Sequence, residues 1–307
     1  MLNEKGNNRW LSAAMIAPVI QAASNCSWVS VLVIGFLCGA IIYGMRCLNI
    51  EMANTKLLMG IQWLWMLLVV SEFLHWIMMY WPHSGNYYAI PILTLALAVY
   101  SLGKGRREAC AAAGVLLWAI ALLVVMVFLS GLREIRMEHV KPQWKMQTAY
   151  YIVVLLIPAM VSAPKDNGIA GKTALLGVVT SVITTGVLSL EYIESVKAPF
   201  YEMTRSLCLF GTAKRFESVV AAGMTLSYFA LISLLVQTTA DAWGGYKSGK
   251  AGIYISAAFI TLIFQSGMRM NSRLLAIGTL LFWVVLPALE KVLKNNKNTI
   301  DKFWRWC

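Results

Sequence analysis

Glu72 and His75 are the residues in this sequence best suited to chemistry. They lie three residues apart in the apolar run 65–79, so on a helix both side chains occupy one face. A carboxylate in a low-dielectric setting takes up a proton more readily than in water, and a nearby imidazole can share that proton. The pair therefore predicts a proton-coupling site or a site for a substrate ammonium group. The alternative is an internally satisfied pair that joins two helices.

Two prolines, Pro18 and Pro158, each interrupt a short apolar segment. Proline removes a backbone N–H donor and clashes with the preceding turn, so it breaks or kinks a helix. In a bilayer such broken backbone persists only where it is buried or lines a cavity. The N-terminal ends of half-helices favour an anionic group such as a carboxylate. We therefore expect the two breaks to bind an amino acid or a similar small solute; the alternative is a pair of kinks without function.

Polar residues beside the two breaks, and one on a later span, complete the predicted binding site. Gln21 follows the first break and Ser162 follows the second. Ser227 lies on the predicted eighth span, where a hydroxyl more commonly bonds to a neighbouring helix than to a ligand. The full predicted substrate-binding set is Ala17, Pro18, Gln21, Glu72, His75, Pro158, Ser162 and Ser227.

Motifs of enzymes and metalloproteins are missing from the sequence. It has no phosphate-binding loop, no catalytic-triad pattern and no paired carboxylates arranged for hydrolysis. Its three histidines have no metal-ligand spacing. We therefore expect no enzymatic activity, no metal and no other cofactor.

The elements that must position these residues are membrane-spanning helices. Of the 307 residues, 59% are hydrophobic and 13% are charged, whereas soluble domains carry about 25% charged residues. Many apolar runs approach the ~20 residues that cross a bilayer. The runs cover residues 10–24, 27–48, 57–81, 87–103, 108–131, 147–162, 173–193, 215–241, 251–267 and 273–290. Ten spans without a long polar block predict one membrane domain over residues 1–307.

The ten predicted spans divide into two sets of five, and each set opens with its proline-interrupted segment. The first set covers residues 1–146 and the second 147–291, followed by a basic and aromatic cytoplasmic tail at 292–307. Interrupted segments at corresponding positions of two halves are typical of inverted-repeat transporters. Only nine residues precede Trp10, so we expect a shortened first span.

The basic residues, which give a formal net charge of +12, are spread over the loops and the tail. A nucleic-acid site would instead show a basic stripe interleaved with aromatic residues, so we expect no nucleic-acid partner. With the N-terminus inside, sixteen of the 26 Lys and Arg residues fall on the inner side. This bias predicts a cytoplasmic N-terminus, although four cations crowd one predicted outer loop.

The stretch Pro199–Ser218 resembles the segment before the eighth span of spore-germination receptor B-subunits. It has a Pro-aromatic start, an amphipathic piece containing Arg205, a small-residue break, and the triplet Arg215-Phe-Glu217 at the head of the next helix. The family shows the same order of features.

Two shorter stretches resemble the same family. Ile16-Ala-Pro18 followed by Trp28-Val-Ser30 is similar to its broken first span and the Trp that opens its second. Gly103-Lys-Gly-Arg106-Arg107-Glu108 is similar to its connection between the fourth and fifth spans. The order of spans agrees over nearly the whole chain.

This resemblance implies an all-α, leucine-transporter-like fold of the amino acid/polyamine/organocation superfamily, with about ten helices in a 5+5 inverted repeat. It implies an amino-acid-sensing subunit in the spore inner membrane or the bacterial plasma membrane. The solute would bind at the broken first and sixth spans, near the third and eighth. An A-subunit membrane protein and a C-subunit lipoprotein would be its partners.

Three residues of the family-like stretch, Arg205, Arg215 and Glu217, are expected to act in gating or coupling. We expect the arginines to latch the amphipathic segment to the eighth span, with Glu202 or Glu217 as the acidic partner. Two other functions stay open. One is a proton-coupled amino acid permease of the plasma membrane that uses Glu72 as its proton site, and the other is a structural scaffold with a vestigial pocket.

Overall fold

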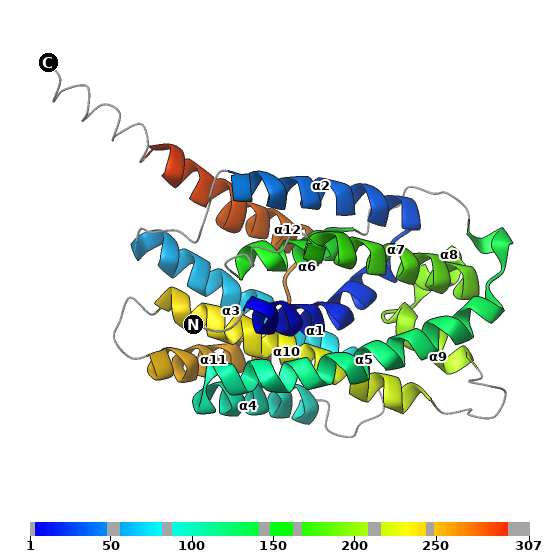
Figure 1. Ribbon diagram of the computed structural model, residues 1–307, viewed down its shortest axis with the longest axis horizontal. Coiled ribbons are helices and arrows are strands. Elements are labelled where there is room, and N and C mark those ends of the chain that lie inside the picture. The colour runs from blue at the N-terminus through cyan, green and yellow to red at the C-terminus, as the bar shows by residue number, and fades with distance from the viewer. Residues whose placement is uncertain are drawn as a thin grey trace, which may run out of the picture.

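The computed structural model describes residues 4–47, 56–81, 88–140, 148–161, 168–207, 216–243 and 249–293. Every regular element in these ranges is helical (Figure 1). The α-helices are α1 (Glu4–Ala23), α2 (Trp28–Cys47), α3 (Lys56–Met79), α4 (Ala89–Lys104), α5 (Arg106–Glu134), α6 (Ala149–Met160), α7 (Gly168–Leu188), α8 (Leu190–Ser195), α9 (Pro199–Ser206), α10 (Glu217–Trp243), α11 (Gly249–Gln265) and α12 (Ser272–Leu280). A short 3-10 turn (Met137–His139) follows α5, and a π-helical stretch (Leu281–Val285) continues α12.

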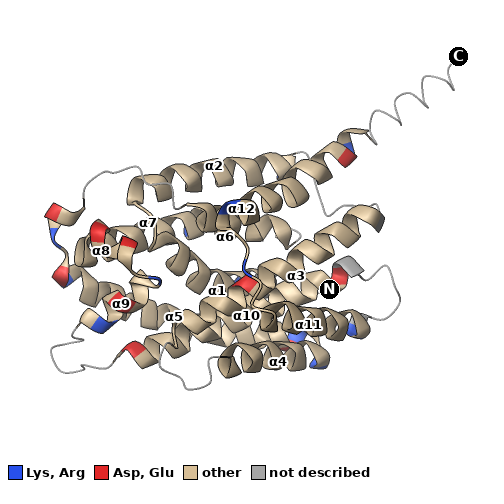
Figure 2. Cartoon of the chain, turned by 180° about the vertical axis from the view of Figure 1, so that it is seen from behind, with Lys and Arg blue, Asp and Glu red and all other residues tan. Residues whose placement is uncertain are grey.

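Over the described residues the chain is an all-helical membrane protein. Each of the ten predicted apolar runs contains a helix, and six helical segments are long and apolar enough to cross a bilayer. These six are Trp28–Cys47, Leu57–Met79, Arg106–Glu134, Gly168–Leu188, Glu217–Asp241 and Ser272–Leu293. The apolar helices α4, α6 and α11 are shorter. Charged residues gather mostly toward the ends of the helices and leave long uncharged stretches between them (Figure 2).

The first helix is longer than the sequence predicted. We expected a shortened span over residues 10–24, but α1 begins at Glu4 because the polar residues before Trp10 continue the helix. Most side chains from Trp10 to Ser24 are buried. They are buried because α1 lies among α5, α6, α7 and α10 (Figure 1).

Pro18 lies inside α1 without unwinding it, which corrects the expectation of a broken first span. The physical reason is a side chain from α10. The Ser227 hydroxyl donates to the carbonyl O of Ala13 at 2.6 Å and accepts from the backbone N–H of Ala17 at 3.0 Å. It satisfies backbone groups beside the proline, as a low-dielectric interior requires. In the second half, Pro158 lies in the last turn of α6, which ends two residues later.

Replacing Ser227 by alanine is expected to lower the free energy of unfolding by about 1–3 kcal/mol, because buried backbone groups of α1 lose a partner. Titration of the detergent-solubilised protein with SDS, followed by circular dichroism, measures this change. Ser233→Ala is the matched control, since the Ser233 hydroxyl donates only to the Phe229 carbonyl on its own helix. Equal losses in the two variants would contradict the assigned role of Ser227.

The described helices pack closely on one another, both within and between the two predicted halves of the chain. α1 packs against α5 and α7, and α6 packs against α12 and α2. Likewise, α3 packs against α4 and α11, and α10 packs against α11 and α4. The two halves meet where α2 packs on α7, α3 on α10 and α1 on α6.

Candidate functional site

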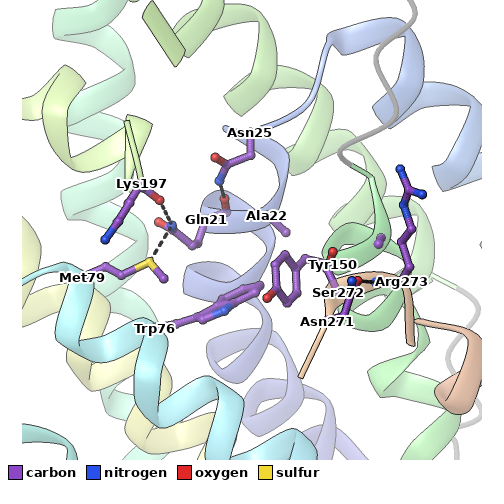
Figure 3. Close-up of a pocket in the computed structure, with 11 residues that line it drawn as sticks. Gln21, Ala22, Asn25, Trp76, Met79, Tyr150, Lys197, Asn271, Ser272 and Arg273 are labelled. Atoms are coloured by element: carbon purple, nitrogen blue, oxygen red, sulfur yellow. Dashed lines mark hydrogen bonds between the residues drawn. The ribbon is translucent and has the colours of Figure 1, made fainter. Parts of the chain in front are cut away.

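A polar cavity of about 450 Å³ lies where α1 and α3 end and α6 and α12 begin. The connection between α8 and α9 closes another side of it. Its wall consists of Gln21, Ala22, Asn25, Trp76, Met79, Ala149, Tyr150, Lys197, Asn271, Ser272 and Arg273 (Figure 3). The volume falls within the range of about 300–1,000 Å³ typical of small-molecule sites. This end of the bundle is therefore the candidate binding site.

Gln21 ties together three parts of the cavity wall. Its Oε1 accepts a hydrogen bond from the Tyr80 hydroxyl at 2.7 Å, just beyond the end of α3. Its Nε2 donates to the carbonyl O of Lys197 at 3.3 Å and lies 3.8 Å from the Met79 sulfur (Figure 3). The amide thus holds the end of α1 against the end of α3 and against the α8–α9 connection.

Glu72 reaches the cavity through Tyr150. The glutamate is 4% exposed, and its Oε1 accepts a hydrogen bond from the Tyr150 hydroxyl at 3.1 Å. Tyr150 itself lines the cavity and packs edge-on against Trp76, with ring centroids 5.0 Å apart. The carboxylate therefore lies one side chain behind the wall.

The hydrogen bond and ring contact of His75 are made to partners other than Glu72. Its Nδ1 lies 2.9 Å from the carbonyl O of Ser71, and its ring packs 4.7 Å from that of Phe264 on α11. The two residues share a face of α3 but turn to different neighbours, Glu72 to α6 and His75 to α11. Each residue thus joins α3 to a different helix.

Positive charge borders the cavity on opposite sides. Lys197 and Arg273 flank it, and the first residues of α12 form part of its wall (Figure 3). The Asn271 Oδ1 caps α12 by accepting the backbone N–H of Arg273 at 2.9 Å. A helix N-terminus and two cations favour an anionic ligand group. The Trp76 and Tyr150 rings, with Glu72 behind them, favour a cationic group.

The predicted binding residues do not all lie at one site in the structure. Gln21 lies on the cavity wall, and Glu72 lies directly behind it. The others lie elsewhere: Ala17, Pro18 and Ser227 lie at the α1–α10 contact, His75 faces α11, and Pro158 is near the far end of α6. Ser162 lies outside the described residues.

Two of the three predicted coupling residues, Arg205 and Glu217, lie on α9 and α10. Arg205 pairs with Glu202 within α9, with Nη1 and Oε2 3.1 Å apart, because the i,i+3 spacing places that acid on the same helix face. Glu217 is the first residue of α10. Glu202, one of the two acidic partners expected for the arginines, is thus the one that Arg205 contacts, and the expected latch to α10 stays a prediction. Arg215 lies outside the described residues.

Much of the cavity wall was not predicted from the sequence. Trp76, Tyr150, Lys197, Asn271 and Arg273 come from four separate segments near the ends of predicted spans. A usable signal was present, because the outer ends of the first, third, sixth and tenth predicted spans all carry polar or aromatic side chains. What the sequence lacks is the information that these ends meet.

No protein-family model matches this chain, and no curated protein matches it by sequence. The family resemblance therefore rests on the three stretches quoted above. What it implies for function has to be argued from the geometry of the cavity and tested by experiment.

Proposed function

We propose that this protein is the membrane-embedded nutrient-sensing subunit of a spore germinant receptor, and that it binds an amino acid in the cavity. The observation that carries the binding proposal is the cavity wall itself. It combines flanking cations and a helix N-terminus with a buried carboxylate behind a tyrosine. The three family-like stretches supply the receptor context.

The two ends of an amino acid match the two sides of the wall. The carboxylate is placed toward Arg273 and the start of α12, where a cation and a helix N-terminus lie together. The ammonium group is placed toward Trp76 and Tyr150, where the ring faces and the Glu72 charge stabilise a cation. The amide groups of Gln21 and Asn25 provide further hydrogen bonds between these ends.

We also propose a leucine-transporter-like arrangement of five plus five helices. The recurrent packing supports it, because exchanging α1, α2, α3, α4 and α5 for α6, α7, α10, α11 and α12 converts many helix contacts into others that are present. The opposite directions of α1 and α6 support it too, since α1 ends at the cavity where α6 begins. Several pairs depart from the pattern, among them α4 on α5 and α5 on α7, whose counterparts are not main contacts of the described helices. The α1–α10 contact departs most. α1 packs directly on α10, whereas α3 and α6 meet at the cavity through the side chains of Glu72, Trp76 and Tyr150.

Ligand binding would be transmitted through the Gln21 network. A ligand that takes up the Gln21 amide releases the Lys197 carbonyl and so loosens the α8–α9 connection from α1. This biases an open–closed equilibrium only if the ligand binds one state more tightly than the other. α9 contacts α1, α7 and α10, which supports a coupling role for this helix and for Arg205, Arg215 and Glu217. The A-subunit and C-subunit of a receptor in the spore inner membrane are the proposed recipients of the signal.

A proton-coupled amino acid permease of the plasma membrane is the second candidate. The observation that favours it is the burial of the Glu72 carboxylate within a membrane-spanning helix, a common setting for proton relays. In that case the solute itself would cross the bilayer.

The proposal is tested by germination of spores from a deletion strain that lacks other germinant receptors, across a panel of single amino acids. The intact gene and a Gln237→Ala control should restore the response to one amino acid, while Gln21→Ala should not. Gln237 is a fair control because its amide donates to Asp241 near the opposite end of α10. Full rescue by Gln21→Ala would contradict the assignment of the cavity as the amino-acid-binding site. Normal germination without the gene would favour the permease.

A further inference from the structure

A second, smaller cavity of about 160 Å³ lies among α1, α5 and α7. Its wall is largely apolar, with Met15 and Ile16 on one side and Leu117 and Leu176 on the others. Next to it, Leu175 is 66% exposed, so this flank of α7 faces the surrounding lipid. The cavity is thus a groove on the lipid-facing side of the bundle, away from the amino-acid site.

The groove has a polar end and an apolar end. α1 and α7 run side by side in the same direction, because Ser12 shares the groove with Lys172 and, further along, the Ser181 hydroxyl donates to the Cys26 carbonyl. Lys172 lies in the second turn of α7, and Leu176 lies one turn deeper. The polar end of the groove therefore points toward the membrane surface on which α1 and α7 begin.

Arg9 adds a second cation at the polar end. It precedes Ser12 by one turn on α1, and its Cδ lies 4.0 Å from the position that a Cβ on Gly114 of α5 would take. Gly114 in turn lies one turn before Leu117. Within the described ranges, neither Arg9 nor Lys172 forms an ion pair with an acidic side chain. Cations on membrane-spanning helices are costly without an anionic partner or access to the headgroup layer.

We propose that this groove binds an anionic glycerophospholipid, with one acyl chain along the apolar wall and the phosphate between Lys172 and Arg9. Basic sites between membrane helices are suited to anionic lipid headgroups, and the acyl chain covers apolar surface that a free phosphate ion leaves exposed. The lipid would fill the space between α1, α5 and α7. The lipid site shares no residue with the amino-acid cavity. The lipid-binding proposal is therefore independent of the proposed sensing function.

The test is lipid retention by the purified full-length protein, measured by native mass spectrometry during titration with dioleoyl phosphatidylglycerol or dioleoyl phosphatidylcholine. We expect one phosphatidylglycerol to bind in preference to phosphatidylcholine. Each basic residue near a headgroup contributes about 1 kcal/mol, so Lys172→Gln and Arg9→Gln should each weaken phosphatidylglycerol binding about fivefold. Leu176→Phe, which fills the groove, should weaken both lipids.

Two matched controls are available on the same molecule. Lys250→Gln removes an exposed lysine at the start of α11, and Leu175→Phe enlarges a side chain that already faces lipid; both should bind as wild type. Equal binding of the two lipids, or an equal loss in Lys172→Gln and Lys250→Gln, would overturn the proposal. Displacement of the lipid by an equal concentration of inorganic phosphate would overturn it as well, because the acyl groove would then contribute nothing.

Discussion

Replacing Arg273 by glutamine is expected to raise the dissociation constant of the amino acid by about tenfold to a hundredfold. A hydrogen bond between a charged donor and a carboxylate contributes about 1.5–3 kcal/mol, and each 1.4 kcal/mol corresponds to about a tenfold change in affinity. Arg273 stands at the start of α12, where the helix N-terminus adds to its positive charge. Isothermal titration calorimetry on the solubilised protein measures the change, and the dose needed for half-maximal germination should move with it.

The role of the arginine can be separated from a general loss of charge. The amide derivative of the same amino acid lacks the carboxylate, so it should bind wild type weakly and should be little affected by Arg273→Gln. Arg133→Gln is the control, because Arg133 is an exposed residue at the end of α5, near the same end of the bundle but outside the cavity wall. Tight binding of the amide to wild type, or an equal loss in Arg133→Gln, would show that Arg273 does not bind the carboxylate.

The helices could be predicted from the sequence because a bilayer imposes a length and a composition that single runs of residues reveal. The proline positions were visible, but their consequence was not. The Ser227 hydroxyl, which bonds to the α1 backbone just before Pro18, comes from a helix far away in the sequence. The segment around Pro18 gives no information about this hydroxyl, so the contact could not be predicted from that segment alone.

The candidate site was predictable only where a residue conflicts with its local surroundings. Glu72 stands out because a carboxylate is costly in an apolar helix, and Gln21 stands out because it follows the proline. Tyr150 and Arg273 give no such signal, since aromatic and basic residues are ordinary at the ends of membrane spans. Their importance comes from the meeting of α6 and α12 at one cavity, which is a property of packing.

Glu72→Gln is expected to weaken binding of the amino acid about tenfold while leaving binding of the corresponding 2-hydroxy acid unchanged. Glutamine keeps an oxygen that accepts the Tyr150 hydroxyl, so the cavity wall keeps its shape and only the negative charge is lost. A tenfold change equals about 1.4 kcal/mol, a modest value for opposite charges in a partly buried site. The Glu72 charge attracts the ammonium group of the amino acid but not the neutral hydroxyl of the analogue. The selectivity that wild type shows for the amino acid should therefore disappear in Glu72→Gln.

Two further variants decide what Glu72 does. Glu134→Gln removes an exposed carboxylate at the end of α5 and should leave both affinities unchanged, whereas Tyr150→Phe removes the bond that joins Glu72 to the wall and should weaken both ligands. Equal weakening of both ligands by Glu72→Gln would mean that the carboxylate only positions Tyr150. Proteoliposomes address the competing function. If wild type accumulates the amino acid when a proton gradient is applied and Glu72→Gln does not, the buried carboxylate carries a proton with the solute, and the protein is a permease rather than a sensor.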